Sequence, residues 1–243
     1  MEKASKNFIK ELKKQKRENK SLLFLDNVKI IKDTISSKTI VPKYVLTSLS
    51  SLDFDCDGAE IYHVDDLTIS QLADTKTPQK VLCIAYYTQH IVKKPEGNFL
   101  VLDGLQDPGN VGTLIRTAKA AGFDSVFLID SVKSNNSKLV RSSVGAVFNS
   151  NVFEMTKVEF VEFAKGNNLK LICCDMNGEN IFEFSCKENV GVVVGNEGQG
   201  VSDELASLCF KTVKIPMMEG IESLNAGVSG SIIMYQLNKK LFK

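Results

Sequence analysis

Hydrophobic and polar residues follow a repeated order along the chain, in which short apolar runs alternate with longer amphipathic stretches. In the second half the apolar runs predict buried strands at 99–105, 125–130, 151–155, 169–175, 188–196 and 211–217. The stretches between them have apolar residues at helical spacing and predict helices at 110–122, 137–149, 158–168, 201–209 and 223–241. Strands that alternate with helices of this length favour a parallel sheet with helices on both faces.

The first half predicts a smaller α/β unit. Strands are expected at 41–48, 59–64 and 80–88, a helix runs from 66 to 72, and 22–35 opens as a strand and continues as a helix. The polar segment 93–98 contains Pro and Gly, which is typical of a linker. We therefore expect a helix or arm at 1–20, a small domain at 21–95 and a larger domain at 96–243.

Charge adds one feature to this picture. The net charge of the 243 residues is only +1, so a surface for nucleic acid would have to be a local patch. Residues 1–20 contain eight Lys or Arg against three Glu, with Phe8, Ile9 and Leu12 at helical spacing. Two interpretations remain open: a solvated helix that docks through this apolar stripe, or a basic arm that contacts RNA phosphates.

Cysteine and histidine usage argues against a metal site. The six Cys form no C-x-x-C pair and only two His are present. The charged first twenty residues lack the apolar core of a signal peptide, and no apolar run approaches the length that spans a bilayer. These features predict a reduced, cytoplasmic protein without a membrane segment.

Three glycine-containing turns follow predicted strands, at 107–112, 195–200 and 215–220. In an open parallel sheet, ligands bind beyond the carboxyl ends of the strands. The second turn reads G-x-x-G-x-G, which is not the dinucleotide fingerprint, and it contains Glu197, which is poorly placed for a pyrophosphate. The turns therefore favour a small ligand with a positive centre, and they disfavour a nicotinamide-dependent oxidoreductase.

The same turns lie within three longer segments that carry a resemblance. LDGLQDPGNVGTLIRTAKAAGF (102–123), VVVGNEGQGVSDE (192–204) and VKIPMMEGIESLNAGVSGSIIMYQL (213–237) resemble, in order, the three signatures of the SpoU/TrmH family of RNA 2′-O-ribose methyltransferases in the SPOUT superfamily. Residues 67–85 resemble the end of the family's ribosomal-protein-like substrate-binding domain. Lys80 and Asn151 depart from the pattern, because Gly and Pro are common at those positions. The resemblance implies a C-terminal α/β domain with a deep trefoil knot and a smaller RNA-binding domain at 21–95.

The resemblance also implies a cofactor and a set of site residues. The cofactor would be S-adenosylmethionine, with Gly195, Ile215 and Leu224 contacting its adenine and ribose largely through main-chain groups. The full expected cofactor set is Gly195, Asn196, Ile215, Met217, Leu224 and Asn225. The expected catalytic set is Asn110, Arg116, Glu197, Ser223 and Asn225.

Arg116 stands between the apolar residues Leu114, Ile115 and Ala118, so its head group is expected to be partly buried and to reach back to the pocket mouth. Glu197 is its expected partner. A guanidinium keeps its proton in almost any protein setting, which makes a role as general base unattractive. Stabilisation of the developing alkoxide and binding of a phosphate both remain open.

The implied activity is transfer of a methyl group to a ribose 2′-hydroxyl, with ribosomal RNA favoured over transfer RNA as the substrate. Transfer RNA remains an alternative, as does a non-catalytic knotted protein that only binds RNA. The resemblance further implies a homodimer that packs through the knotted domain. The last helix offers an apolar stripe for this contact, at Val228, Ile232 and Tyr235.

Overall fold

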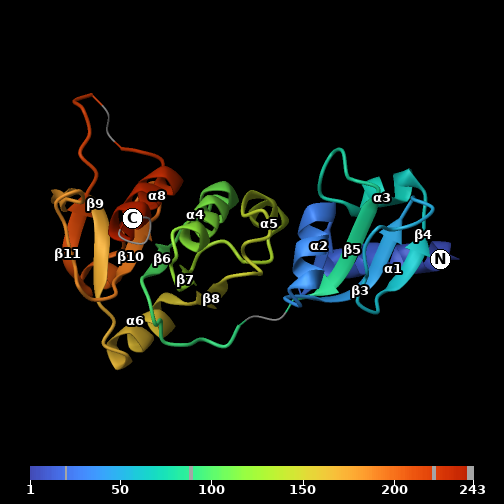
Figure 1. The fold of residues 1–243 in the computed structure, drawn as a ribbon, viewed down its shortest axis with the longest axis horizontal. Coiled ribbons are helices and arrows are strands. Elements are labelled where there is room, and N and C mark those ends of the chain that lie inside the picture. Colours follow the sequence, from blue (N-terminus) through green and yellow to red (C-terminus); the bar gives the residue numbers. More distant parts are fainter. Residues whose placement is uncertain (20, 88–89, 221–222, 240–243) are drawn as a thin grey trace. The chain divides into compact units, whose positions relative to one another are not determined.

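The computed structural model describes residues 1–19, 21–87, 90–220 and 223–239. The chain divides into two compact units, Met1–Thr88 and Gln89–Lys243 (Figure 1). The division lies a few residues before the polar Pro/Gly segment of the sequence. Each unit has its own sheet and its own hydrophobic core.

The first unit is built on a five-stranded mixed sheet with the order β1-β4-β3-β5-β2. β3 is parallel to β4, whereas β5 is antiparallel to both β2 and β3. The elements in chain order are β1 (Glu2–Lys3), α1 (Lys6–Glu18), β2 (Leu22–Leu25), α2 (Val28–Ser36), β3 (Val41–Thr47), β4 (Glu60–His63), α3 (Asp66–Leu72) and β5 (Val81–Tyr86).

The basic segment at the start of the chain is the helix α1, and it packs on the first unit. Leu12 is buried in the core of this unit, and Phe8 and Ile9 pack against the same cluster. The Lys16 ammonium donates to the Leu72 carbonyl and contacts the Asp74 carboxylate at 2.7 Å. The apolar stripe predicted from the sequence therefore docks the helix, while a contact of its remaining Lys side chains with RNA stays a prediction.

The second unit contains a six-stranded sheet in which every pairing is parallel, with the order β11-β9-β10-β6-β7-β8. Its elements are β6 (Phe99–Asp103), α4 (Pro108–Ala120), β7 (Ser125–Ile129), α5 (Ser137–Ser142), β8 (Asn151–Met155), α6 (Lys157–Gly166), β9 (Leu171–Asn180), β10 (Gly191–Gly195), α7 (Asp203–Ala206), β11 (Cys209–Lys214) and α8 (Ala226–Leu237).

Helices cover both faces of this sheet, as the sequence predicts. Val193 packs in a cluster with Phe160 of α6 and Leu205 of α7. Its neighbour Val194 points to the opposite face, where it lies close to Gly230 of α8. α4 packs against both α5 and α8. The predicted α/β fold with a parallel sheet is confirmed, and the trefoil knot stays a prediction.

The structure corrects the helix expected at 137–149. α5 ends at Ser142, and Val144 and Gly145 adopt positive φ angles of 52° and 76°, which a right-handed helix cannot contain. The apolar residues beyond them, Val147 and Phe148, are buried all the same. These apolar residues are therefore buried by turns rather than by a helix.

The helix expected at 201–209 is also shorter, because α7 holds only Asp203–Ala206. Cys209 already belongs to β11, which pairs with β9. β11 therefore begins and ends earlier than the strand expected at 211–217. Ser202 occupies the position before α7, but its side chain makes no capping hydrogen bond there. β9 runs on to Asn180, five residues beyond its predicted end. The last two residues of the helix expected at 223–241 lie outside the described residues.

Candidate active site

A cavity of about 440 Å³ lies beside the middle of β9 and at the carboxyl ends of β10 and β11. The second and third glycine turns meet there, as expected. The lining residues come from four segments: the middle of β9, the end of β10 with its turn, the end of β11 with its turn, and the start of α8 with the residues just before it. They are Cys174, Asp175, Met176, Val194, Gly195, Asn196, Glu197, Gly200, Val213, Lys214, Ile215, Met217, Ser223, Leu224, Asn225, Ala226, Ser229 and Ile233.

The structure brings most of the expected site residues together. All six residues of the expected cofactor set line the cavity. Glu197, Ser223 and Asn225 of the expected catalytic set line it as well, whereas Asn110 and Arg116 do not. The third signature segment, 213–237, also contains Ile221 and Glu222, which lie outside the described residues.

The second turn is closed by its own backbone. The Asn196 and Gly200 amides each donate to the other residue's carbonyl, at 2.9 Å in both directions. The Asn196 side chain accepts from the Gly198 and Gln199 amides and donates to the Gly104 carbonyl at the end of β6. A Cβ on Gly195 would lie 2.1 Å from the Gly200 carbonyl carbon. Glycine at 195 is therefore needed so that the two sides of the turn can approach.

The first turn starts α4 and reaches the second turn through one side-chain contact. Asp107 caps the helix by accepting from the Gly109 and Asn110 amides. These bonds, the Gly109 bond foremost, together with the nearby Lys138 ammonium, hold the pKa of Asp107 below its ordinary value against the opposing effect of desolvation. The Asn110 amide donates to the Glu197 carboxylate at 3.0 Å. Asn110 therefore lies beside the cavity without lining it.

Arg116 does not lie where the sequence analysis expected it. Its side chain is exposed, and it makes no ion pair or hydrogen bond with a residue that the structure describes. The reason is the phase of α4, whose buried face is formed by Val111, Leu114, Ile115 and Ala118. Arg116 lies on the other side of the helix, and the Glu197 carboxylate binds Asn110 instead.

The start of α8 completes the cavity. The Asn225 side chain accepts from the Val228 amide and caps the helix, as expected for Asn at this position. Gly227 permits a close approach of α8 to α4. A Cβ at this position would lie only 3.3 Å from the Asn110 Oδ1 atom, which is tighter than an ordinary contact. Ser231 Oγ donates to Thr117 Oγ1 at 3.1 Å, which ties the two helices one turn further along.

Two neighbouring cysteines of β9, Cys173 and Cys174, differ in their chemistry. Burial raises the pKa of Cys174, so the thiol that lines the cavity stays neutral. A hydrogen bond with Cys209, and a weaker one with Thr212, lower the pKa of Cys173 to about 6 despite its burial. Cys173 packs in the core cluster with α6 and does not line the cavity. The cavity wall therefore offers an apolar sulfur rather than a thiolate nucleophile.

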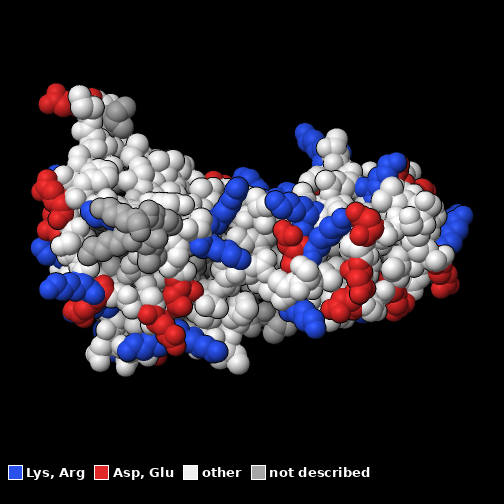
Figure 2. Space-filling model, viewed as in Figure 1, with Lys and Arg blue, Asp and Glu red and all other residues white. Residues whose placement is uncertain are grey.

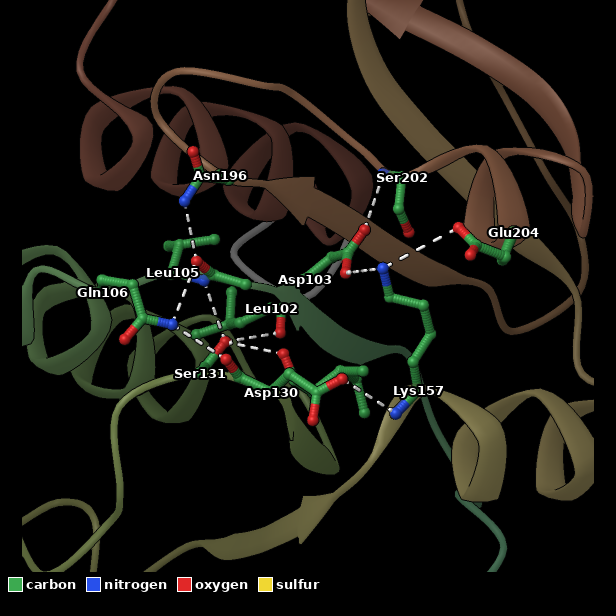
Figure 3. A network of polar contacts seen from close by, with 12 residues as sticks. Leu102, Asp103, Leu105, Gln106, Asp130, Ser131, Lys157, Asn196, Ser202 and Glu204 are labelled. Atoms are coloured by element: carbon green, nitrogen blue, oxygen red, sulfur yellow. Dashed lines mark hydrogen bonds and ion pairs between the residues drawn. The ribbon is translucent and has the colours of Figure 1, made fainter.

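The sequence analysis missed Asp103, the last residue of β6. Its side chain is 3% exposed, and its carboxylate accepts from the Ser202 amide at 2.7 Å (Figure 3). A charged residue at the end of the otherwise apolar run FLVLD was the available signal. Cys174, Asp175 and Met176 were missed as lining residues because the sequence analysis assigned site residues only to the three glycine-containing turns and the segments that follow them.

Within residues 1–19, 21–87, 90–220 and 223–239, no group of three or more His, Cys, Asp or Glu side chains could hold a metal ion. In that same part of the chain, no helix has the length and apolar composition needed to cross a bilayer.

Comparison with solved structures shows the same fold over the whole chain. The S-adenosylmethionine-bound rRNA methyltransferase of Sinorhizobium meliloti superimposes with a TM-score of 0.87 at 21% identity, over 100% of this chain and 98% of that one. A structure described as an RNA 2′-O ribose methyltransferase gives a TM-score of 0.83 at 22% identity, over 100% of both chains. At these identities the likeness shows the fold alone.

Sequence comparison adds a relative and a family. The 23S rRNA (guanosine(2553)-2′-O)-methyltransferase RlmP of Bacillus subtilis (strain 168) is 29% identical over 227 residues, which cover 92% of this chain and 91% of the relative. The model of the SpoU rRNA Methylase family matches residues 97–235. Because this match spans more than half of the chain, the protein belongs to the SpoU rRNA Methylase family.

Proposed function

We propose that the protein transfers a methyl group from S-adenosylmethionine to a ribose 2′-hydroxyl of ribosomal RNA. The observation that carries this proposal is the cavity itself, since the second and third family signatures converge on it and the first contacts it through Asn110. The Bacillus subtilis relative, which is named for this reaction on 23S rRNA, matches the chain over 91% of its own length and so supports the substrate class.

The cavity residues fit S-adenosylmethionine. The cavity volume of about 440 Å³ lies in the range of small-molecule sites. Gly195 brings backbone close to backbone at one wall, and Val194, Ile215 and Leu224 supply apolar surface around main-chain groups that can bind an adenine and a ribose. Asn196, Met217 and Asn225 complete the proposed cofactor contacts. When bound, the cofactor supplies an electrophilic methyl group on a positively charged sulfur.

The chain's own polar groups would align the ribose and stabilise charge. Ser223 and Asn225 line the cavity and are proposed to orient the ribose. Asn110 holds the Glu197 carboxylate at the cavity edge, where its negative charge would favour a positively charged cofactor. Oriented polar groups of this kind favour a transition state whose charge distribution they match.

We propose that Arg116 acts on the RNA rather than on the cofactor. Its guanidinium is exposed on α4, outside the cavity, and has no partner among the described residues. An unpaired guanidinium can bind a phosphate with two parallel hydrogen bonds, and it can stabilise an alkoxide that is brought to it. Either role requires the RNA to be present, which fits the exposed position.

RNA binding would use local basic surfaces, since the whole chain is nearly neutral. Lys and Arg side chains lie over the region of α4 and α5 on the face drawn in Figure 2. The sequence of these two helices contains Arg116, Lys119, Lys138 and Arg141. We assign substrate choice to the domain at 21–95 together with the basic helix at 1–20. The methyltransferase chemistry is assigned to 96–243. Such an enzyme would act in the cytoplasm.

We also propose a homodimer that forms through the α8 side of the second unit. Val228 and Tyr235 on α8 are 47% and 45% exposed, and Ile232 between them is half-buried. Large apolar side chains along one helix face are typical of a surface that a partner covers.

Methyl transfer to separate RNA classes tests the proposed function. The wild-type protein is incubated with methyl-labelled S-adenosylmethionine and with unmodified ribosomal RNA or unmodified transfer RNA. We expect label in ribosomal RNA. Label in transfer RNA alone would show that transfer RNA, and not ribosomal RNA, is the substrate. Binding of S-adenosylhomocysteine without any methyl transfer would favour a non-catalytic RNA-binding protein. Failure to bind S-adenosylhomocysteine would contradict the proposed function altogether.

A further inference from the structure

The buried carboxylate of Asp103 has no place in the chemistry described above. Asp103 ends β6, where its register partner on β10 is the cavity residue Gly195. Its own side chain does not line the cavity. A buried carboxylate is unfavourable unless hydrogen bonds or opposite charges compensate it. The Asp103 carboxylate therefore needs such partners.

Two groups contact the carboxylate in Figure 3, one at each oxygen. One oxygen accepts from the Ser202 backbone amide at 2.7 Å. The other lies 3.9 Å from the Lys157 ammonium at the start of α6, and this ammonium is 3.8 Å from the Glu204 carboxylate. The short contact is therefore to the backbone that leads into α7, while Lys157 offsets the buried negative charge.

The second glycine turn is thus attached to the end of β6 at two points. At its start, the Asn196 side chain donates to the Gly104 carbonyl at 2.8 Å. Two residues beyond its end, the Ser202 amide donates to Asp103. Glu197 and Gly200, which lie between these points, line the cavity. The buried Ser202 hydroxyl makes no hydrogen bond to a described residue, so it offers no substitute for the Asp103 contact.

We propose that Asp103 is a positioning residue that holds the turn 195–202 in the shape that binds the cofactor. This inference rests on the proposed function, because it assigns the cofactor to the same cavity. Without the anchor, the turn samples conformations in which Glu197 and Gly200 no longer form the cavity wall. The apparent affinity then falls by the fraction of molecules that keep the binding-competent shape.

Two substitutions remove this contact from opposite sides. Asp103→Ala deletes the acceptor, and Ser202→Pro deletes the donor at a residue whose φ of −65° already suits proline. Asp103→Asn keeps an acceptor oxygen and serves as the conservative variant. Glu154→Ala is the matched control for Asp103→Ala, since Glu154 is a largely buried carboxylate of the same unit that accepts a loop amide, from Ser134 at 2.8 Å, and pairs with Lys133.

The test combines calorimetry with S-adenosylhomocysteine, thermal melts, hydrogen exchange and steady-state methylation on the full chain. We expect Asp103→Ala and Ser202→Pro to weaken binding by about tenfold or more, to speed amide exchange in 196–202, and to raise KM for the cofactor with little change in kcat. Asp103→Asn should recover most of the affinity. Glu154→Ala should lower the melting temperature without changing affinity.

The outcomes separate this proposal from the proposed function. If the wild type binds S-adenosylhomocysteine and Asp103→Ala binds it equally well, with a lower melting temperature only, Asp103 is merely structural and the proposal is overturned. Equal affinity of Ser202→Pro, folded and with unchanged exchange in 196–202, overturns it as well. A wild type that binds no S-adenosylhomocysteine contradicts the proposed function, and the hydrogen-exchange comparison then still decides whether Asp103 holds the turn.

Discussion

At the scale of single residues, Gly195 and Gly198 belong to the same turn but face different surroundings. A Cβ on Gly195 would overlap the Gly200 backbone, whose nearest atoms lie at 2.1–2.2 Å. A Cβ on Gly198 would meet only the Asn196 side-chain oxygen, at 3.6 Å, which is an ordinary contact. Glycine is therefore needed at 195, where the two backbone segments of the turn approach each other, and not at 198.

These two glycines form a matched pair of variants. Gly195→Ala should weaken binding of S-adenosylhomocysteine by about tenfold or more, because relieving the overlap displaces the cavity wall. Gly198→Ala should bind like the wild type. Isothermal calorimetry on both variants measures the difference, and equal affinities would show that the turn does not form the cofactor site.

Arg116 gives a second prediction for a single residue, because its exposed position separates an effect on turnover from an effect on cofactor affinity. Arg116→Ala should reduce single-turnover methylation by a factor on the order of 10²–10³, the usual effect of removing one charge-assisted transition-state contact. Cofactor affinity should stay unchanged, because the side chain lies outside the cavity. Arg116→Lys should recover little, since an ammonium lacks the planar set of donors. Near-normal turnover in Arg116→Ala would remove this residue from the mechanism.

The residue scale also shows what the sequence could and could not reveal. The cavity residues from the second and third turns were predicted because each signature is contiguous in the chain. The outward direction of Arg116 was readable from the spacing of Val111, Leu114, Ile115 and Ala118, and it was misjudged. Asp103 could be noticed as unusual, but its partner Ser202 is 99 residues away, so its role needed the structure.

At the scale of elements, short helices were the least predictable. α5 and α7 have only 6 and 4 residues, too few for a periodic pattern to fix their ends. Their boundaries depend on left-handed backbone at Val144 and on the pairing of β11 with β9. The long helices α4 and α8, with 13 and 12 residues, begin at Pro108 and Ala226, close to their predicted starts at 110 and 223.

The cap of α4 gives a prediction that depends on pH. Asp107→Ala should lower the free energy of unfolding by about 1 kcal/mol, because the Gly109 and Asn110 amides lose their acceptor. Asp107→Asn keeps the acceptor and should lose less. The pKa of Asp107 is lowered from 3.8 by folding, chiefly through the Gly109 amide. The charge of the carboxylate therefore stabilises the fold above pH 3.8 and ceases to do so as the pH falls through the lowered value.

Urea unfolding of the wild type and of Asp107→Asn at pH 7 and pH 2 measures this contribution. The wild type should be the more stable of the two at pH 7, and the margin should shrink at pH 2. The margin will be small, because the Asp107 side chain is 45% accessible and its charge is screened. A margin that stays the same at both pH values would assign the effect to the shape of the side chain rather than to its charge.

At the scale of the whole molecule, the order of strands explains why distant signatures meet. β10 lies between β9 and β6, and β11 lies beyond β9, so parallel strands bring their carboxyl-end turns to one edge. The alternation of strands and helices predicted the parallel sheet, but local patterns contain no information about which strands become neighbours. The pocket could therefore be expected from the family resemblance and located only in three dimensions.

Self-association is the prediction that belongs to this scale. The purified protein should have the mass of a dimer at micromolar concentration, because Val228 and Tyr235 leave apolar surface on α8. Tyr235→Glu should shift the mass towards the monomer, since it would place a charge in the contact. Sedimentation equilibrium of both proteins provides the measurement. A monomeric wild type would exclude the proposed contact, and a dimeric Tyr235→Glu would place the interface elsewhere.

The measurement that tests the central claim most directly is mass spectrometry of the nucleosides from ribosomal RNA treated with this protein and deuterated-methyl S-adenosylmethionine. The account predicts one labelled nucleoside whose extra methyl group remains with the ribose fragment when the glycosidic bond breaks. The Gly195→Ala protein should give little of this product at limiting cofactor. Label that remains with the base fragment, or an RNA without label although the protein binds the cofactor, would contradict the assignment of a ribose 2′-O-methyltransferase.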